Sequence, residues 1–387
     1  MNKFETTRRG VLAGAVLAGG IGGARAQGAV GINIVDAAGN LALTRPGFEN
    51  FRKANPGRVG RITYTQAPAP EIPGKLQAQQ NAGRVDIDLV LGGNDVLAAG
   101  IELKLWAPLL TQYASSLPKL DAILNPMAKK LQVAAENQAV VVAVCPGGPI
   151  LEYMPDRVKQ VPATAEELLA WCKAHPKRFM YARPANSGPG RAFMMGLPYL
   201  LGDSNPKDPI KGWDKTWAYL TEMSSTIEYY PTGTGAVMKE FGEGTRDMIA
   251  SHVGWDINPR VLGVVPKEAK VSTLKGFHWI GDSHFMCVPK GLEPAKMALI
   301  LELVSFMMQP AQQAFIYDQG YFYPGPAVEG VTLAMAPKAS QDAIAEFGRP
   351  EYAAMIADNP IELPLDSAGL VYAFRRWDEQ VGSKVGK

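Results

Sequence analysis

The alternation of short β-rich runs with helical patterns limits how this chain can fold more than any other feature of its sequence. In the first hundred residues, strands and helices are predicted in turn at 31–35, 48–54, 61–65, 75–82 and 85–91. Turn residues close these elements, and the pair Gly92-Gly93 follows the third strand. Strands that alternate with helices predict a mainly parallel sheet, whose ligands bind at the carboxyl ends of the strands.

The same alternation resumes after a break at residues 146–149, which read Pro-Gly-Gly-Pro. Thr164-Ala-Glu-Glu167 is a capping box that opens a helix to residue 173. Further strands and helices are predicted at 179–181, 190–201, 235–241, 251–254, 284–288 and 296–315. With 387 residues, 47% of them hydrophobic, the chain is long enough for two packed α/β domains.

The N-terminus carries an export pattern. Arg8 and Arg9 precede an uncharged run over 10–24, and Ala24-x-Ala26 offers small side chains for cleavage. Residues 1–26 therefore resemble a twin-arginine signal peptide, which implies the twin-arginine export machinery, a signal peptidase and a periplasmic location. A membrane anchor is the alternative, although the run is shorter than the roughly 20 residues needed to span.

Charge argues against nucleic acid or a membrane surface as the partner. The whole chain has a formal net charge of +2, from 39 basic and 37 acidic residues. Residues 1–26 hold four of these basic residues and one acidic residue, so the rest of the chain has 35 against 36, or −1. The basic excess belongs to the export signal alone, and the remainder fits a freely diffusing monomer.

Catalytic and metal-binding motifs are missing from the sequence. The three cysteines, Cys145, Cys172 and Cys287, have no CxxC spacing and lie in apolar settings, which predicts buried thiols rather than disulfides or a nucleophile. No nucleophile elbow, dinucleotide-binding glycine pattern or zinc spacing of the four histidines occurs. We therefore expect no enzyme activity, no cofactor and no metal; a secreted enzyme or a cofactor-bearing redox protein exported in folded form is the alternative.

Four segments, in order and spacing, resemble the periplasmic solute-binding proteins of ABC importers, in the group that binds spermidine/putrescine, thiamine and ferric iron. The segments lie at 48–56, 85–94, 183–188 and 288–313; the last reads Val288-Pro-Lys-Gly, then a helical stretch, then Gln309-Pro-Ala-Gln-Gln313. Ferric binders of the group use adjacent tyrosines, and the pair Tyr229-Tyr230 is out of place for that role, so iron is not expected.

The resemblance implies a type II periplasmic-binding-protein fold, with two α/β lobes that close on a small solute and then dock on a membrane permease. Carried onto this chain, one lobe takes 28–145 and 285–330 and the other takes 146–280. The tail, 331–387, is expected as helical turns packed on the outside. Whether the partner is an ABC permease or another receptor stays open.

Candidate cleft residues of the second lobe lie where loops enter helices. The loop 184–191 contains Asn186, Ser187, Gly188 and Arg191, and a helix start there favours an anionic or strongly polar group. A plain helix cap is the alternative interpretation. The next such loop contributes Thr232 and Thr234 by the same argument.

The remaining candidates point to different solutes. Asp36, Asn40 and Asn94 follow first-lobe strands. Trp255 and Trp279 could stack on a ligand. Asp256 and Asp282 could accept hydrogen bonds from an amine. Tyr321 and Tyr323 resemble an aromatic loop that often lines the cleft, with core packing as the alternative. The aspartates indicate an amine, whereas Ser187 and Arg191 indicate an anion. A compound that carries both charges, or a polyamine-like or thiamine-like cation, is the expected solute.

Overall fold

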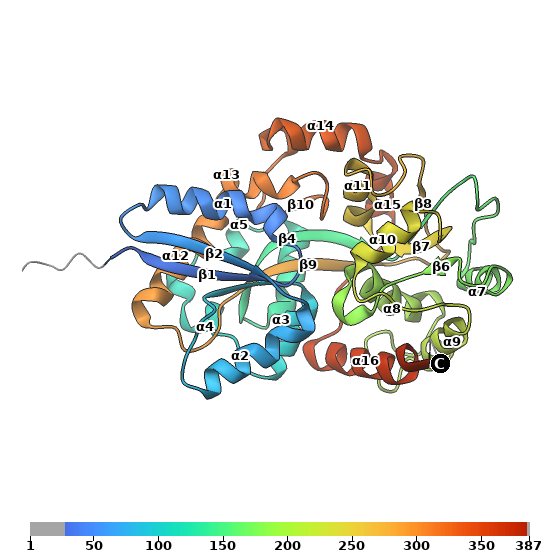
Figure 1. Ribbon diagram of the computed structural model, residues 1–387, viewed down its shortest axis with the longest axis horizontal. Helices are drawn as coiled ribbons and strands as arrows, with labels where there is room; N and C mark the ends of the chain where they lie inside the picture. Colours follow the sequence, from blue (N-terminus) through green and yellow to red (C-terminus); the bar gives the residue numbers. More distant parts are fainter. Residues whose placement is uncertain (1–27, 385–387) are drawn as a thin grey trace, which may run out of the picture.

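The computed structural model describes residues 28–384, which gather around two β-sheets (Figure 1). The larger sheet has the strand order β10-β4-β9-β3-β1-β2, with β11 paired to β9. Its strands are β1 (Val30–Asp36), β2 (Val59–Gln66), β3 (Leu89–Gly92), β4 (Ala139–Gly148), β9 (Trp279–Cys287), β10 (Gly325–Pro326) and β11 (Ile361–Glu362). The smaller sheet has the order β6-β7-β5-β8, formed by β5 (Ile150–Tyr153), β6 (Phe179–Met180), β7 (Met248–Ser251) and β8 (Lys270–Ser272).

Three parallel strands build the edge of the larger sheet that matters for the site. β1 pairs with both β2 and β3, and the helices α1 (Leu41–Ala54) and α2 (Ile72–Asn81) return the chain between them. Because parallel strands share a direction, their carboxyl ends, at Asp36, Gln66 and Gly92, come to one edge.

Two long antiparallel strands connect the sheets. β4 pairs with β9 from Ala139 opposite Cys287 to Gly148 opposite Ile280, and every residue of both strands is buried. The chain enters the smaller sheet directly after β4, at Ile150, and returns from β8 to β9. In Figure 1 these strands run side by side from one lobe to the other.

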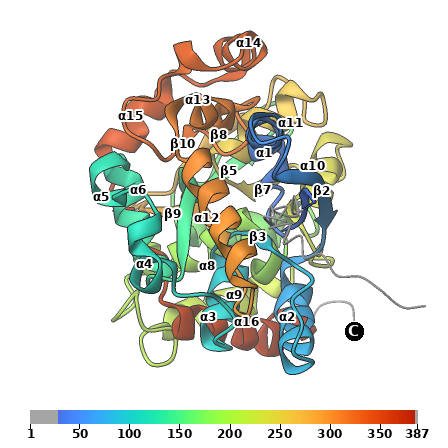
Figure 2. The same cartoon turned by 90° about the vertical axis from the view of Figure 1, so that its left-hand side faces the viewer.

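Helices cover both sheets. Around the larger sheet lie α3 (Asn94–Glu102), α4 (Leu109–Gln112), α5 (Leu120–Ile123), α6 (Pro126–Gln132), α12 (Pro294–Met307) and α13 (Pro310–Gln313). Figure 2 looks at this end of the molecule, where Phe51 of α1 packs on Phe306 of α12 with ring centroids 5.4 Å apart. Around the smaller sheet lie α7 (Ala165–Ala174), α8 (Gly188–Leu200), α9 (Asp214–Ser224), α10 (Thr234–Gly242) and α11 (Val253–Val261).

The C-terminal helices lie on opposite sides of the molecule. α14 (Lys338–Phe347) and α15 (Glu351–Asp358) lie at the top of Figure 1, and α16 (Ser367–Gln380) lies at the bottom. α16 buries Trp377 edge-on against Tyr230, with ring centroids 4.8 Å apart, in the core of the smaller sheet. Within residues 28–384, no helix has the length and apolarity that a membrane crossing requires.

Several predicted elements are confirmed and others are corrected. The capping box forms: Thr164 Oγ1 accepts from the Glu167 amide at 3.2 Å, and Glu167 accepts from the Ala163 amide at 2.8 Å. The strand predicted over 251–254 is wrong, because β7 ends at Ser251 and α11 begins at Val253. A short apolar run does not distinguish a strand end from a helix start. The helix predicted from Phe48 begins seven residues earlier, at Leu41.

Candidate functional site

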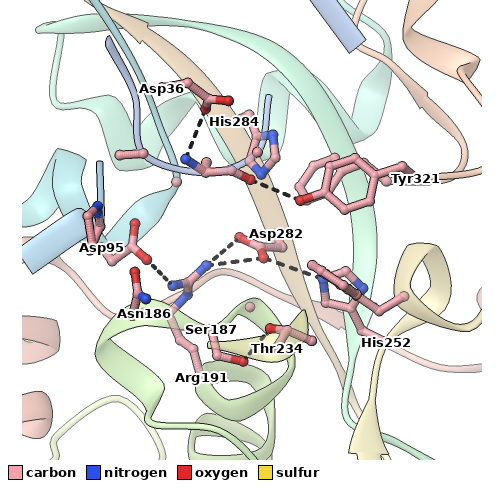
Figure 3. A pocket seen from close by; sticks show the side chains of 18 of the residues that line it. Asp36, Asp95, Asn186, Ser187, Arg191, Thr234, His252, Asp282, His284 and Tyr321 are labelled. Atoms are coloured by element: carbon pink, nitrogen blue, oxygen red, sulfur yellow. Dashed lines mark hydrogen bonds and ion pairs between the residues drawn. The ribbon is translucent and has the colours of Figure 1, made fainter. Parts of the chain in front are cut away.

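A pocket of about 380 Å³ opens between the two lobes (Figure 3). The carboxyl ends of β1 and β2 and the start of α3 form one side of it, and the starts of α8, α10 and α11 form the other. The sequence-predicted residues that line it are Asp36, Asn186, Ser187, Gly188, Arg191, Thr234, Trp255, Asp282 and Tyr321. Residues far apart in the chain thus meet where the parallel-sheet argument placed the ligand.

An ion-paired network centred on Arg191 forms the floor of the pocket. The guanidinium of Arg191, which is buried, donates from Nη1 to Asp95 Oδ2 at 2.9 Å and from Nη2 to both oxygens of Asp282 at 3.1 Å. Arg191 lies on α8, Asp95 on α3 and Asp282 on the connecting strand β9, so the network links both lobes and this connecting strand. Burial by itself would raise the pKa of Asp282, but Arg191 and then His252 outweigh it and hold the pKa well below its usual range.

Asp36 organises the first loop of the site. Its Oδ1 accepts from the amides of Ala38 and Asn40, and its Oδ2 accepts from the Leu41 amide at the start of α1. These bonds explain why α1 begins at Leu41, since the carboxylate satisfies amides that the helix leaves free. Burial raises the pKa of Asp36 above its ordinary value, and the backbone donors only partly oppose that shift.

Two histidines contribute to the pocket wall. The His284 Nδ1 accepts from Asn40 Nδ2 at 3.0 Å, and burial lowers the pKa of His284 to about 4, so the ring is neutral at pH 7 with its proton on Nε2. His252 is 1% exposed, and among the described residues neither of its ring nitrogens has a hydrogen-bond partner; its Nε2 lies 3.7 Å from Asp282 Oδ2.

Two helix starts meet on the second lobe. Ser187 Oγ accepts from the Gly190 amide and caps α8, and it shares a 2.7 Å hydrogen bond with Thr234 Oγ1 at the start of α10. Gly188 leaves room for the floor of the pocket, because a Cβ there would lie 2.7 Å from Asp282 Oδ2. Opposite these helices, Trp255 and Tyr321 meet edge to face with ring centroids 5.3 Å apart.

Six predicted site residues do not line the pocket. Asn40 and Asn94 lie one layer behind it, where Asn94 Nδ2 donates to Asp282 Oδ1 at 2.8 Å. Thr232 is exposed and only its carbonyl takes part, as acceptor from Asn186 Nδ2. Trp279 is fully buried against Phe277, and Tyr323 packs against the same hydrophobic cluster. Both aromatic residues therefore pack in the core, which was the stated alternative for Tyr323, and Trp279 does not stack in the pocket as predicted.

Asp256 has a structural role instead of the predicted contact with an amine. Its carboxylate is fully buried and bonded to Arg260, Arg349 and Tyr352, at distances of 2.6 to 3.1 Å. Because all its acceptor capacity is directed at these side chains, Asp256 joins α11 to the segment that enters α15 and does not line the pocket.

Sequence reasoning missed several residues that the fold brings to the pocket. These are Gln66, Ala67, Pro68, His252 and His284; Gly93, Asp95 and Phe322 lie in loops that were expected at the cleft but were not themselves named as contacts. Asp95 had a usable signal, since it lies two residues after the pair Gly92-Gly93 at the end of β3. The histidines were weighed only as metal ligands, and within the described residues no group of three or more His, Cys, Asp or Glu is arranged to hold a metal ion.

Two α/β lobes joined by crossing strands, with a polar pocket between them, define a periplasmic binding protein of the type II class, as the resemblance implied. The expectation of a mainly parallel sheet in each lobe is wrong for the smaller sheet, where β5 enters directly from β4 and runs antiparallel to both β7 and β8, and only β6 and β7 are parallel. The chain belongs to the family described as bacterial extracellular solute-binding protein, whose model matches residues 48–346. Among curated proteins, none matches the chain in sequence.

Solved structures share the fold at low identity. A putative spermidine/putrescine ABC transporter protein from Listeria monocytogenes is 15% identical, with a TM-score of 0.62 over 90% of this chain and 98% of that one. A periplasmic thiamin binding protein is 15% identical, with a TM-score of 0.63 over 93% and 97%. The periplasmic binding protein AfuA from Actinobacillus pleuropneumoniae, solved with fructose-6-phosphate, is 14% identical, with a TM-score of 0.63 over 91% and 98%.

Proposed function

We propose that this protein is the solute-binding component of an ABC importer, which captures a small polar organic solute in the pocket and delivers it to a membrane permease. The observation that supports this most is the pocket itself, whose charged and aromatic lining comes from both lobes and from the connecting strand. Binding that favours one arrangement of two lobes is sufficient for such a protein, and no bond-making step is needed.

The lobes of this proposal follow the predicted boundaries, with 28–145 and 285–330 in one lobe and 146–280 in the other. The bond from Arg191 to Asp95 and the bond from the Ala69 amide to Asn186 Oδ1, at 3.2 Å, both join one lobe to the other. Contacts of this kind stabilise a closed arrangement, in which the solute is shielded from water.

The proposal also includes export and location. Residues 1–26 would act as a twin-arginine signal, removed after Ala26, and the mature monomer would work in the periplasm. These residues lie outside the described part of the chain, so the sequence pattern alone supports this part. Replacing Arg8 and Arg9 together with lysine should trap the precursor in the cytoplasm, as measured by cell fractionation; unchanged export would exclude the twin-arginine route.

Solute binding can be tested on the mature chain, residues 27–387, with a library of amines, amino acids, sugars and their phosphates. We expect a raised melting temperature with at least one solute, followed by calorimetry on that solute. Trp255→Ala should weaken its binding at least tenfold, because it removes a pocket wall. Leu262→Ala, at a side chain 60% exposed outside the pocket, should not change it. No stabilising solute, or equal binding by both variants, would contradict the proposal.

A further inference from the structure

The two walls of the pocket differ in the polar groups that they present. One presents a carboxylate without a cationic partner and the other presents hydrogen-bond donors, and this difference indicates the class of solute. On the first-lobe wall, Asp36 is 2% exposed, and no Lys, Arg or His of the described residues forms an ion pair with it. Its oxygens accept only from backbone amides. The aromatic rings of Trp255 and Tyr321 line the same pocket, and Tyr321 donates to the Ala38 carbonyl in the Asp36 loop. A buried carboxylate near aromatic rings favours an ammonium group.

The second-lobe wall offers donors. Neither α8 nor α10 has an acidic residue in its first turn, and no side chain caps α10. The hydroxyls of Ser187 and Thr234 share one hydrogen bond, which uses one of their two protons and leaves the other free to donate. Helix starts and a free hydroxyl proton favour a carboxylate.

His252 is an independent sign of a missing polar partner at this wall. It is 1% exposed, it lines the pocket, and among the described residues neither ring nitrogen makes a hydrogen bond; Nε2 lies 3.7 Å from Asp282 Oδ2, and Nδ1 has neither a hydrogen-bond nor an ion-pair partner. Buried polar side chains are normally hydrogen-bonded, so an unpartnered imidazole at a pocket wall indicates a place for a ligand group.

The floor of the pocket argues against a polyamine. Asp95 and Asp282 are the other carboxylates of the pocket, and both are bound to the Arg191 guanidinium. Further N–H donors occupy them: Ser283 and Asn94 donate to Asp282, and Val96 donates to Asp95, at 2.8 to 3.0 Å. Arg191 thus already fills the position in which these two carboxylates would hold a second ammonium group. Of the three pocket carboxylates, Asp36 alone has no cationic side chain bound to it, although it too accepts from backbone amides, and its charge remains for a cation.

We propose that the solute is amphoteric, with an ammonium group held at Asp36 and a carboxylate held between the starts of α8 and α10, and that Arg191 excludes diamines by occupying Asp95 and Asp282. This inference rests on the proposed function and narrows its solute to small amino acids and their betaines. Figure 3 shows Asp36 and the Ser187–Thr234 pair on opposite sides of the Arg191 network.

Calorimetry on the mature chain tests this with amphoteric probes: alanine, glycine betaine and the ω-amino acids of three to six carbons. Each probe is compared with compounds of the same length that carry only one kind of group, namely the amine or diamine and the carboxylate. At least one amphoteric probe should bind ten times more tightly than both of its singly functional counterparts. Tightest binding by a diamine, a carboxylate or a sugar phosphate would overturn the inference and leave the proposed function standing. Binding by nothing in these probes or in the wider polar library would count against both.

Variants then test the two ends separately. Asp36→Asn should lower the affinity for the amphoteric probe at least tenfold, because the charge that selects an ammonium is lost. The amphoteric probe should then bind no more tightly than the carboxylate analogue, so its affinity advantage over that analogue disappears. Thr234→Val should remove its advantage over the amine analogue, whereas Thr221→Val, on α9 outside the pocket, should leave both advantages unchanged. Retention of both advantages in the two pocket variants would overturn the assignment, whatever the wild-type affinity.

Discussion

Replacing Asp256 with asparagine should destabilise the fold severely, although sequence reasoning placed this residue in the binding site. The Asp256 carboxylate is fully buried and accepts five hydrogen bonds: two each from Arg260 and Arg349 and one from Tyr352. Asparagine keeps the volume but removes the charge, and its amide group then faces donors. Two guanidinium groups, with side chains 5% and 12% exposed, lose their shared counter-ion.

The expected magnitude follows from this burial. Removing one partner of a buried ion pair costs about 3–5 kcal/mol, because the remaining charge stays desolvated. Since a typical protein is stable by about 5–15 kcal/mol, Asp256→Asn should remove a third or more of the unfolding free energy. Arg349→Gln should cost less, about 1.5–3 kcal/mol, since the Arg260 bonds to the carboxylate remain.

Urea unfolding of the mature chain, followed by tryptophan fluorescence and far-UV circular dichroism, measures these differences. The matched control is Asp342→Asn, whose side chain is 62% exposed and paired with Lys338 within α14; its change should stay below about 0.5 kcal/mol. A cost below about 1 kcal/mol for Asp256→Asn, or one no larger than that of the control, would refute the assignment of Asp256 to the structural core.

Three further predictions concern a glycine, a buried acid and the thiols. Gly188→Ala should abolish solute binding, measured by calorimetry, since its Cβ would lie 2.7 Å from Asp282 Oδ2. The control is Gly74→Ala, in open space on α2, which should retain binding and gain about 0.5–1 kcal/mol of stability in urea unfolding. Burial raises the pKa of Glu152 from 4.5 to about 8, so between these pH values the carboxyl is ionised in the unfolded chain and protonated in the folded one. The free energy of unfolding should therefore fall by up to about 5 kcal/mol as pH rises from 4.5 to 8. Glu152→Gln should flatten this slope in urea unfolding at a series of pH values, and an unchanged slope would contradict a raised pKa for Glu152. A thiol reagent should react with the native chain at none of its cysteines and with all of them in denaturant, because the three are buried with raised pKa values; fast labelling of native protein would disprove this for Cys145, Cys172 and Cys287.

Local sequence patterns correctly predicted those elements that depend on contacts between a few neighbouring residues. The Thr164 capping box, the strand that leads to Gly92 and the helix that starts after Ser187 depend on contacts within one turn or one strand. The strand predicted over 251–254 failed because its apolar residues fit a helix start equally well, and packing on neighbouring elements decided between the two.

The prediction of site residues likewise succeeded where local position in the chain is enough and failed where packing between distant segments decides. Residues at strand ends or helix starts, such as Asp36, Ser187 and Thr234, were found from their position in the chain and line the pocket. Trp255 and Asp256 are adjacent, yet one lines the pocket and the other binds Arg349, 93 residues away. The rotation of a helix about its axis separates such neighbours, and this rotation is set by what the helix packs against.

The sequence by itself determined the α/β alternation and the loops from which the site is built, because periodicity and turn chemistry are local. The two-lobed class followed from the resemblance of four segments, in order and spacing, to a known family. Only the tertiary structure decided which charged side chains line the pocket and which of them are already paired. Arg191, read from the sequence as a candidate for binding an anion, is occupied by Asp95 and Asp282, which lie 96 and 91 residues away in the chain. Electrostatic compensation depends on distances of a few ångströms across the fold, and no pattern of neighbouring residues records it.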